Sequence, residues 1–445
     1  MFESNTHIDF KSIAKGIPYR KLAGMILKNA KIMTMDIDGN FDDGFLVIEN
    51  DRIQKMGAMS VYQENEQGQT VISLKGAWIL PGFIDAHSHL GLFDDGLDFE
   101  GDDGNESSDP ITPQIRAVDG IYNADNCFRE AYEGGVSLVM AGPGSGNVMS
   151  GQFALLHTYE KTLEKAVIEP MAAQKAAFGE NPKRVYGKED KAPITRMGAA
   201  SLMRETLFKA QEYEKKWKTY QEKMDRNDED EDEPDTPEFD FQLESLRPLI
   251  KGEIPLKIHA HRQDDILTAI RICNEFGLCY TLDHCTEGHL IADVLSEEYK
   301  AGQAKGRGSG NIQAKGGRLL GVIAGPIIGD RSKPELAKAT IKTSAILHTA
   351  GIPLAIMTDH PCVPEQYLSL SAAIAVKGGL SYEAALSAIT LGAAKIIGVD
   401  VDYGSLKQGK IADISVFSGD PLDYQSQLQM FIGKGKVIYQ SDSLQ

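Results

Sequence analysis

Four short apolar segments of this chain end in side chains that commonly bind metal ions. The segment WILPGFIDAHSHL contains His87 and His89. In a β-strand, residues two apart point to the same face about 6.5 Å from each other, which lets two imidazoles reach one ion. The segments PLKIHAH, LCYTLDH and IPLAIMTDH end in further candidates, namely His259 with His261, His284, and Asp359.

The spacing of these residues fits consecutive strand-and-helix units. His259 and His284 lie one such unit apart, and Asp359 follows His284 by two units with LLGVIAGP as the strand between them. If the strands are parallel, their carboxyl ends meet at one rim, where barrel enzymes build their active sites. A lone histidine at a strand end is more often a structural residue, but four ligand-bearing strand ends in order are hard to obtain by chance. The pattern therefore predicts a metal site.

The elements that must position these side chains alternate through the middle of the chain. Apolar runs of five to eight residues, each followed by an amphipathic helical pattern, are typical of parallel βα units. Repeated over about 300 residues, they indicate an α/β fold, either a barrel or a doubly wound sheet. Strands are expected at 135–142, 255–261, 278–284, 319–326 and 352–360. Helices are expected at 263–277, 289–299, 335–350 and 381–397.

Both ends of the chain have the pattern of β-structure. Short alternating runs separated by turn signals fill residues 22–80, and ADISVFSG and QMFIGKGKVIYQ repeat the pattern near the C-terminus. We expect one small composite β domain from residues 1–80 and 402–445, around a barrel domain at 81–401.

Two charged segments interrupt this organisation. A long charged helix is expected at 197–224, and it runs into residues 225–240, which have ten acids and one arginine. Together they indicate a charged insertion in the barrel domain around 205–245. We interpret the acidic part as a solvated, partly disordered insertion. An interaction tail or a metal buffer is the alternative. Residues 300–318 carry five basic residues and no acid, which predicts a flexible surface loop.

Composition excludes several classes of protein. The 445 residues include 46 Lys+Arg and 64 Asp+Glu, a net charge of −18 without a concentrated basic segment, so we expect no nucleic-acid partner. Five scattered cysteines form neither a disulfide framework nor a cysteine-based zinc site. The chain has no run near 18 apolar residues and starts without the apolar core of a secretory signal. We therefore expect a cytoplasmic protein without a membrane segment.

The motifs PGFIDAHSHLG, IHAH, LDH and TDHP, the helix LSYEAALSAITLGAAKIIGV and the closing GSLKQGKIADISVFSGDPL resemble the amidohydrolase superfamily. Within this superfamily, the sequence more narrowly resembles the imidazolonepropionase-like and prolidase-like branch. The resemblance covers about residues 24–440. It implies a (β/α)8 TIM-type barrel with a small composite β-sandwich. It also implies that His87 and His89 end strand 1, His259 strand 5, His284 strand 6 and Asp359 strand 8.

The resemblance further implies a metal-dependent hydrolase that cleaves an amide or cyclic amide C–N bond of a small molecule, other than an ordinary peptide bond. One or two divalent ions, zinc or alternatively iron or manganese, would lower the pKa of a bound water from about 15.7 towards 7. Asp359 would act as general base. His284 would either bind a second ion or polarise the carbonyl group.

Two-metal relatives usually have a carboxylated lysine at the end of strand 4. Lys175, after a strand expected at 166–174, is the candidate in this chain, and an ordinary surface lysine is the alternative interpretation. His157 is a less favoured residue that could also face the site.

Several other residues are candidates for the site. Arg184 and Tyr186 could hold a substrate carboxylate, although a structural loop is the alternative. His261 and His360, each close to a proposed ligand, could orient ligands or contact the substrate. Cys285 has no evident base partner, so thiol catalysis is not expected. The glycine-rich residues 141–147 are expected to form the loop after strand 2.

Relatives are commonly oligomeric, so a homo-oligomer is expected. Two other functions stay open at this point. One is a deaminase that uses the same metal site on an amino-heterocycle, and the other is a non-catalytic barrel scaffold that binds a partner through the acidic insertion.

Overall fold

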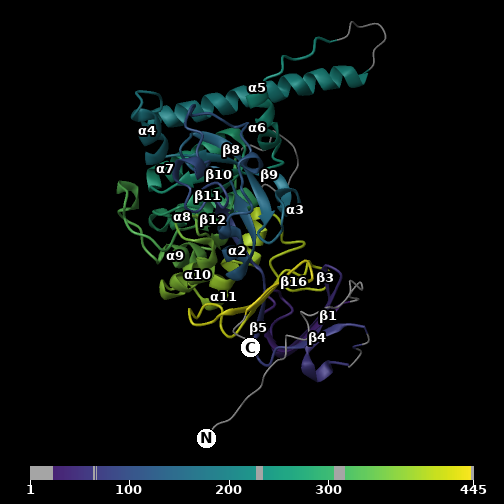
Figure 1. Cartoon of the computed structure of the whole chain (residues 1–445). Helices are drawn as coiled ribbons and strands as arrows, with labels where there is room; N and C mark the ends of the chain where they lie inside the picture. The colour runs from purple at the N-terminus through teal and green to yellow at the C-terminus, as the bar shows by residue number, and fades with distance from the viewer. Residues whose placement is uncertain (1–23, 64–65, 67, 227–233, 305–315, 442–445) are drawn as a thin grey trace.

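The computed structural model describes residues 24–63, 66, 68–226, 234–304 and 316–441. A barrel of strands and helices occupies the centre of the molecule, and a second sheet built from both ends of the chain lies below it (Figure 1). The long helix α5 (Arg196–Arg226) crosses the opposite end of the barrel. The α/β fold expected from the sequence is confirmed.

The barrel is an eight-stranded sheet in which the strands follow one another in chain order, and its first and last strands contact each other, so that it nearly closes. Its strands are β6 (Phe83–Ser88), β7 (Val136–Ala141), β8 (Met149–His157), β9 (Val167–Ala177), β10 (Leu256–Ala260), β11 (Cys279–His284), β12 (Arg318–Ala324) and β13 (Leu354–Ile356). The strands expected at 135–142, 255–261, 278–284 and 319–326 are present, and the one expected at 352–360 is limited to Leu354–Ile356. The positions assigned to strands 1, 5 and 6 fall on or directly after β6, β10 and β11, and Asp359 lies three residues after β13.

The third strand departs from a fully parallel barrel. β8 pairs antiparallel with both β7 and β9, because only residues 142–148 separate it from β7 and a parallel crossover needs a dozen residues or more. These residues include most of the glycine-rich loop that was expected after the second strand. The reversal takes the end of β8 to the opposite rim, where His157 pairs in register with Leu138 near the start of β7. His157 Nδ1 lies there 3.5 Å from Asp413 Oδ2, so the prediction that His157 could face the site is wrong.

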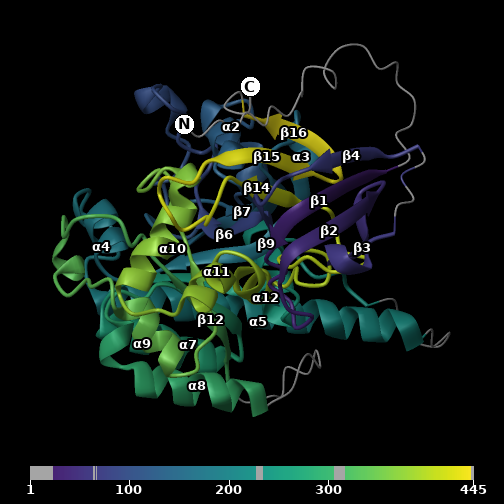
Figure 2. The same ribbon diagram turned by 90° about the horizontal axis from the view of Figure 1, so that it is seen from below.

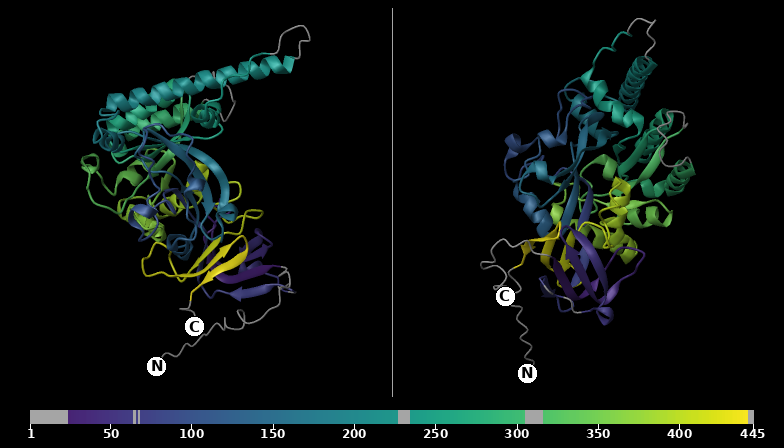
Figure 3. Two further views of the ribbon diagram at one scale, coloured as in Figure 1. Left: turned by 45° about the horizontal axis from the view of Figure 1, so that its top comes forward. Right: turned by 90° about the vertical axis from the view of Figure 1, so that its right-hand side faces the viewer.

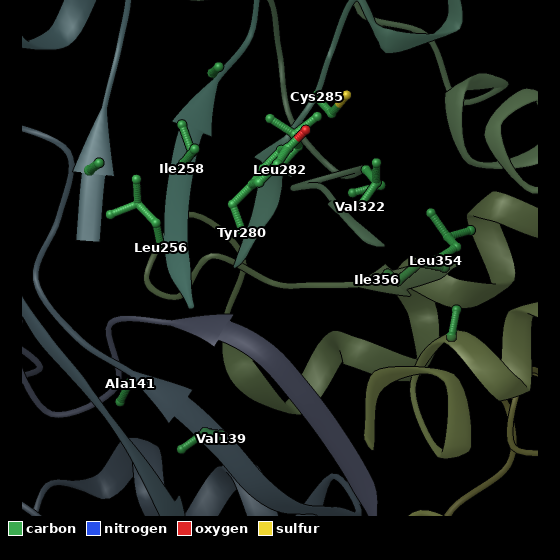
Figure 4. Packing of buried hydrophobic residues seen from close by; sticks show 14 of the residues in the cluster. Val139, Ala141, Leu256, Ile258, Tyr280, Leu282, Cys285, Val322, Leu354 and Ile356 are labelled. Carbon is green, nitrogen blue, oxygen red and sulfur yellow. The ribbon is translucent and has the colours of Figure 1, made fainter. Parts of the chain in front are cut away.

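Along each barrel strand, side chains point alternately outwards to the helices and inwards to the barrel interior, and both environments are buried. Leu256 and Ile258 of β10 pack outwards, with Tyr280, Leu282 and Val322 of the neighbouring strands, against the surrounding helices (Figure 4). Side chains of the intervening positions, such as Lys257 and His259, therefore point into the barrel. The barrel helices are α2 (Asn126–Glu133), α3 (Leu163–Ala166), α7 (Gln263–Phe276), α8 (Ala292–Ala304), α9 (Thr343–Thr349), α10 (Leu368–Lys377), α11 (Tyr382–Ala388) and α12 (Leu391–Ile397).

Three of the expected helices have different bounds in the structure. The helix expected at 289–299 starts only at Ala292, after a 3-10 turn. The segment expected as one helix at 335–350 begins with the 3-10 turn Pro334–Leu336, which buries Glu335 at the barrel rim, and becomes α-helical only at Thr343. The helix expected at 381–397 is interrupted because Thr390 leaves the helical region of φ and ψ.

The second sheet joins the two ends of the chain. β14 pairs antiparallel with β5, so that strands from both ends share one hydrogen-bonded sheet (Figure 2). Its strands are β1 (Met25–Ile32), β2 (Phe41–Glu49), β3 (Arg52–Ala58), β4 (Thr70–Ser73), β5 (Trp78–Pro81), β14 (Ile414–Phe417), β15 (Leu428–Gly433) and β16 (Lys436–Gln440). The division of the chain at residues 80 and 402 stays a prediction.

The charged insertion contains the expected long helix. The first half of α5 is buried through residues such as Met203 and Leu207, whereas the half after Glu214 has no buried residue and extends beyond the barrel (Figure 3). α6 (Phe241–Lys251) returns beside it. Of the acidic segment, residues 227–233 lie outside the described residues, as do residues 305–315 of the basic segment. Among the described helices, none combines the length and the apolar character needed to cross a bilayer.

Candidate metal centre

The proposed ligands converge at the carboxyl-terminal rim of the barrel. Asp359 Oδ1 lies 3.4 Å from His87 Nε2 and 3.2 Å from His89 Nε2. One possible ligand atom from each of His87, His284 and Asp359 lies within 4.8 Å of the others, and all three residues are buried. Side chains separated by more than 270 positions in the sequence therefore lie next to one another.

Hydrogen bonds fix the orientation of the imidazole rings. The Nδ1 atoms of His87, His89 and His284 contact Asp283 Oδ2, Gly142 O and Gly325 O at 2.7, 2.6 and 3.0 Å. Because carbonyl and carboxylate oxygens only accept, each Nδ1 carries the hydrogen. The lone pair of each ring is then on Nε2, the atom that metal-bound histidines present to an ion.

The electrostatics of the centre favour neutral imidazoles around an anionic carboxylate. Burial lowers the pKa of His87 below its usual value, and burial holds the pKa values of His259 and His284 well below theirs. Burial alone would raise the pKa of Asp359, but His284, His87 and His89 hold it well below its usual range. Neutral imidazole nitrogens and a carboxylate oxygen are the donors that zinc, iron and related divalent ions take in proteins. The residues present therefore fit a divalent ion.

Lys175 is buried among the same residues. Its Nζ lies 3.4 Å from His87 Nε2, and the residue is fully shielded from solvent, so the alternative of a surface lysine is wrong. β9 continues to Ala177, past the strand end that was expected at residue 174. Burial lowers the pKa of Lys175 to about 8. A fraction of the Lys175 amine is therefore neutral near physiological pH.

Two charged residues behind His87 were not anticipated from the sequence. Lys257 Nζ lies 3.2 Å from Asp283 Oδ2 and donates to Ala86 O at 2.9 Å, and both charged side chains are fully buried. Burial alone would raise the pKa of Asp283, but Lys257 and His87 hold it far below its usual range. The available signals were the two-residue spacing of Lys257 from His259 and the position of Asp283 directly before His284.

The backbone at two proposed ligands is strained. His284 and Asp359 have φ values of 66° and 55°, in the left-handed region that residues other than glycine seldom adopt. Such strain is concentrated at functional sites. Cys285, next to His284, has a φ of 50°, and burial raises the pKa of its thiol to about 12. A neutral thiol at this position agrees with the expectation that Cys285 is not a nucleophile.

The two additional histidines lie at the centre. The ring of His261 is 4.6 Å from the rings of both His259 and His284, measured between centroids, and its Nδ1 lies 2.7 Å from Thr286 Oγ1. The carbonyl of His360 accepts the backbone N–H of His89 at 3.0 Å. His261 thus belongs to the ligand cluster, whereas His360 supports the strand that carries His89.

Arg184 and Tyr186 lie on α4 (Glu180–Gly187), a helix rather than the loop that was the alternative interpretation. Tyr186 is fully buried, and its hydroxyl donates to Asp109 O at 2.8 Å. Arg184 is exposed. A substrate role for these two residues stays a prediction, and the structure gives the Tyr186 hydroxyl a backbone partner instead.

Residues 251–440 match the model of the amidohydrolase family. A crystal structure of an amidohydrolase from Thermotoga maritima superposes with a TM-score of 0.84 and is 34% identical, covering 94% of this chain and 100% of that one. This similarity extends over the barrel and the sheet formed by the two ends of the chain, which are the parts that the resemblance in sequence had implied.

Two curated relatives are similar over most of this chain. The amidohydrolase tasK of Hapsidospora irregularis is 27% identical over 397 residues, which are 85% of this chain and 38% of that protein. The imidazolonepropionase of Cupriavidus taiwanensis is 24% identical over 417 residues, 89% of this chain and 88% of that one. This chain thus spans less than half the length of the first relative and most of the length of the second.

Proposed function

This chain belongs to the amidohydrolase family, and on that premise we propose that it is a metal-dependent hydrolase of a carbon–nitrogen bond in a small molecule. The bond would be an amide or a cyclic amide other than an ordinary peptide bond. The relative named imidazolonepropionase supports a cyclic substrate.

The observation that carries this proposal is the orientation of the ligand imidazoles. Three rings have their Nδ1 atoms engaged by oxygen acceptors, which leaves the Nε2 atoms of His87 and His89 beside Asp359 Oδ1, and that of His284 in the same cluster. A structural role would not require three separately fixed tautomers around one carboxylate. A site for an ion does, because each ring must present a lone pair.

We assign roles to residues of the chain as follows. His87, His89 and Asp359 would hold one divalent ion, and His259 and His284 a second one. An ion bound there would supply Lewis-acid chemistry, lowering the pKa of water towards about 7 and polarising the carbonyl group. Asp359 would accept a proton from the attacking water and return it to the leaving nitrogen. If only one ion is bound, His284 would polarise the carbonyl oxygen only after taking up a proton on Nε2, because the neutral ring keeps its hydrogen on Nδ1 toward Gly325 O.

Lys175 is proposed as the bridge between the two groups of ligands. Its neutral amine would attack CO2 to give a carbamate, with release of one proton, and the new carboxylate oxygens would each face one ligand group. The position of Nζ beside His87 and the pKa of about 8 support this role.

The metal, the location and the assembly of the chain complete the proposal. Zinc suits the imidazole-rich donor set, with iron and manganese as alternatives. A cytoplasmic location is supported by five free cysteines. A homo-oligomer stays a prediction from the resemblance, to be checked by light scattering.

Metal analysis combined with a substrate panel tests the proposal. The purified chain should hold one or two transition-metal ions and hydrolyse at least one member of a panel of imidazolones, lactams, N-acyl amino acids and Xaa-Pro dipeptides. The Asp359→Asn variant is the matched control and should be inactive on the same compound. Ammonia release from amino-heterocycles without amide hydrolysis would instead identify a deaminase. A protein that holds no metal and gains no thermal stability from added zinc would be a scaffold.

A further inference from the structure

Glu335 has a buried carboxylate in which only one of the two oxygens is hydrogen-bonded among the described residues. Its side chain is only 1% exposed, and its Oε2 accepts the backbone N–H of Glu180 at 3.0 Å. The other oxygen, Oε1, is fully buried and has no hydrogen-bond partner among the described residues. Because burying an unpartnered carboxylate oxygen is costly, this atom indicates a position where a cation binds.

The free oxygen lies near His259 of β10 and near His261, which directly follows that strand. Glu335 Oε1 lies 3.6 Å from His261 Nε2 and 4.0 Å from His259 Nε2. One nitrogen from each of His259, His261 and His284 lies within 4.8 Å of the others. Donors that share one tetrahedral ion at about 2.0–2.1 Å are about 3.4 Å apart. Glu335 Oε1 therefore lies beside a cluster of three histidines, at distances from two of them that are somewhat longer than the separation of two donors on one ion.

The ring orientations agree with this arrangement. The Nδ1 atoms of His261 and His284 are engaged by Thr286 Oγ1 and Gly325 O, which leaves their Nε2 atoms for a ligand. The side-chain amide nitrogen of Asn181 lies 3.3 Å from His259 Nε2, so an ion bound at that nitrogen would displace this contact. Asn181 also accepts from Lys333 Nζ at 3.2 Å. Burial raises the pKa of Glu335, and the positive charge of Lys333 acts from this position to lower it.

The backbone around Glu335 is built to keep its carboxylate in place. Gly179, directly after the strand segment that carries Lys175, has a φ of 96°, and a Cβ there would lie 2.9 Å from Glu335 Oε2. Only glycine allows this close approach without strain. Oε2 is therefore held against α4, and Oε1 is left facing His261.

We propose that Glu335 and His261 are ligands of a divalent cation, which they bind together with His259 and His284. This inference rests on the proposed function, because the ion is the second one of that centre, but it assigns two ligands that the family resemblance does not supply. An ion bound by Glu335 would connect the loop after β12 to the metal centre. Occupancy of the second metal position would therefore hold this loop in place at the barrel rim.

Titration of the chelator-treated protein with zinc tests the assignment. A chromophoric competitor would report two dissociation constants for the native chain. The Glu335→Gln variant, which removes the negative charge at nearly constant shape, should weaken the second constant at least 10-fold and leave the first within 2-fold. Glu180→Gln is the matched control for loss of a nearby negative charge, because Glu180 gives Glu335 its backbone N–H and acts on it otherwise only through its charge, and both constants should stay within 2-fold.

A second measurement is independent of zinc affinity. With cobalt as the probe, the second equivalent should give a visible absorption band whose intensity and position change in Glu335→Gln and in His261→Ala, but not in Glu180→Gln. Circular dichroism of the metal-free variants checks that each one is folded.

The outcomes separate this inference from the proposed function. Two ions with native constants and native cobalt spectra in Glu335→Gln would overturn the inference and leave the hydrolase proposal standing. The same holds if that variant affects only the KM of a positively charged substrate, since Glu335 would then bind substrate and not metal. A native chain that binds no zinc or cobalt would overturn both.

Discussion

The Nδ1 atom of His87 lies 2.7 Å from Asp283 Oδ2, and both side chains are completely buried. Lys257 Nζ approaches the same carboxylate oxygen to 3.2 Å. A buried Lys257–Asp283–His87 chain thus lies directly behind the proposed metal ligands. It keeps the carboxylate ionised and gives His87 a single tautomer, which is what an ion on the Nε2 side needs.

Replacing Asp283 by asparagine should damage both metal binding and folding. Zinc affinity should fall about 10–100-fold, because His87 loses its oriented anion. The free energy of unfolding should fall by about 3–5 kcal/mol, since Lys257 is left buried without its counter-ion. Urea unfolding and zinc titration measure the two effects.

Two further variants separate the loss of zinc affinity from the loss of stability. Asp293→Asn, at an exposed position of α8, should change neither quantity. Adding Lys257→Met to Asp283→Asn should restore much of the stability but not the affinity. Full zinc affinity in Asp283→Asn would show that the anion behind His87 is dispensable.

The Asp359→Asn variant should keep the fold and most of the metal while losing turnover. An amide cannot accept the proton that the carboxylate takes from water, so kcat should fall at least about 100-fold. Metal content and circular dichroism establish that the variant is intact. Near-normal turnover in the intact variant would remove Asp359 from the role of general base.

The sequence predicted that the proposed ligands come together, because they lie at the ends of strands. His87, His89, His259, His284 and Asp359 each follow an apolar run, and parallel pairing brings such strand ends together. The reversed strand β8 was not predicted, because an apolar run has the same pattern in either direction. The less favoured suggestion that His157 could face the site was wrong for this reason.

Lys175→Ala should reduce the metal content of the chain. If Lys175 bridges two ions as a carbamate, the variant should retain one ion where the native chain holds two, as measured by plasma mass spectrometry. Lys165→Ala, at an exposed position ten residues earlier, is the control and should keep the native content. An unchanged count in Lys175→Ala would indicate that the amine has no part in binding.

Metal uptake should depend on pH through the amine of Lys175. Its pKa is lowered to about 8, so below that pH the amine is increasingly protonated and cannot attack CO2, whereas above it the neutral form dominates. Uptake of the second ion by metal-free protein in bicarbonate should therefore be faster at pH 9 than at pH 7. Stopped-flow measurement with and without bicarbonate tests this. A rate that is independent of bicarbonate at both pH values would contradict carbamate formation.

The Gly179→Ala variant should destabilise the rim. A φ of 96° is unfavourable for alanine, and the added Cβ would lie 2.9 Å from Glu335 Oε2, so we expect a loss of more than about 1 kcal/mol in the free energy of unfolding. Gly187→Ala is the matched control, since a Cβ there meets open space at the end of α4. It should be neutral or slightly stabilising. Equal stability of both variants would show that the close approach at Gly179 imposes no constraint.

Lys257 and Glu335 were harder to find in the sequence than the proposed ligands at the strand ends. Lys257 lies in an otherwise apolar strand, and the only feature that points to a role is that it shares a strand face with His259. Glu335 was assigned to a helix expected from residue 335, although it sits in a separate turn and faces the centre from a loop. Loops follow no hydrophobic period, so the partners of their side chains become visible only in three dimensions.

Anomalous diffraction from crystals of zinc-loaded protein tests the central claim most directly. The account predicts a strong peak at the zinc edge between Asp359 and the Nε2 atoms of His87 and His89. A chain that binds zinc elsewhere, or crystals without any peak at this rim, would contradict it.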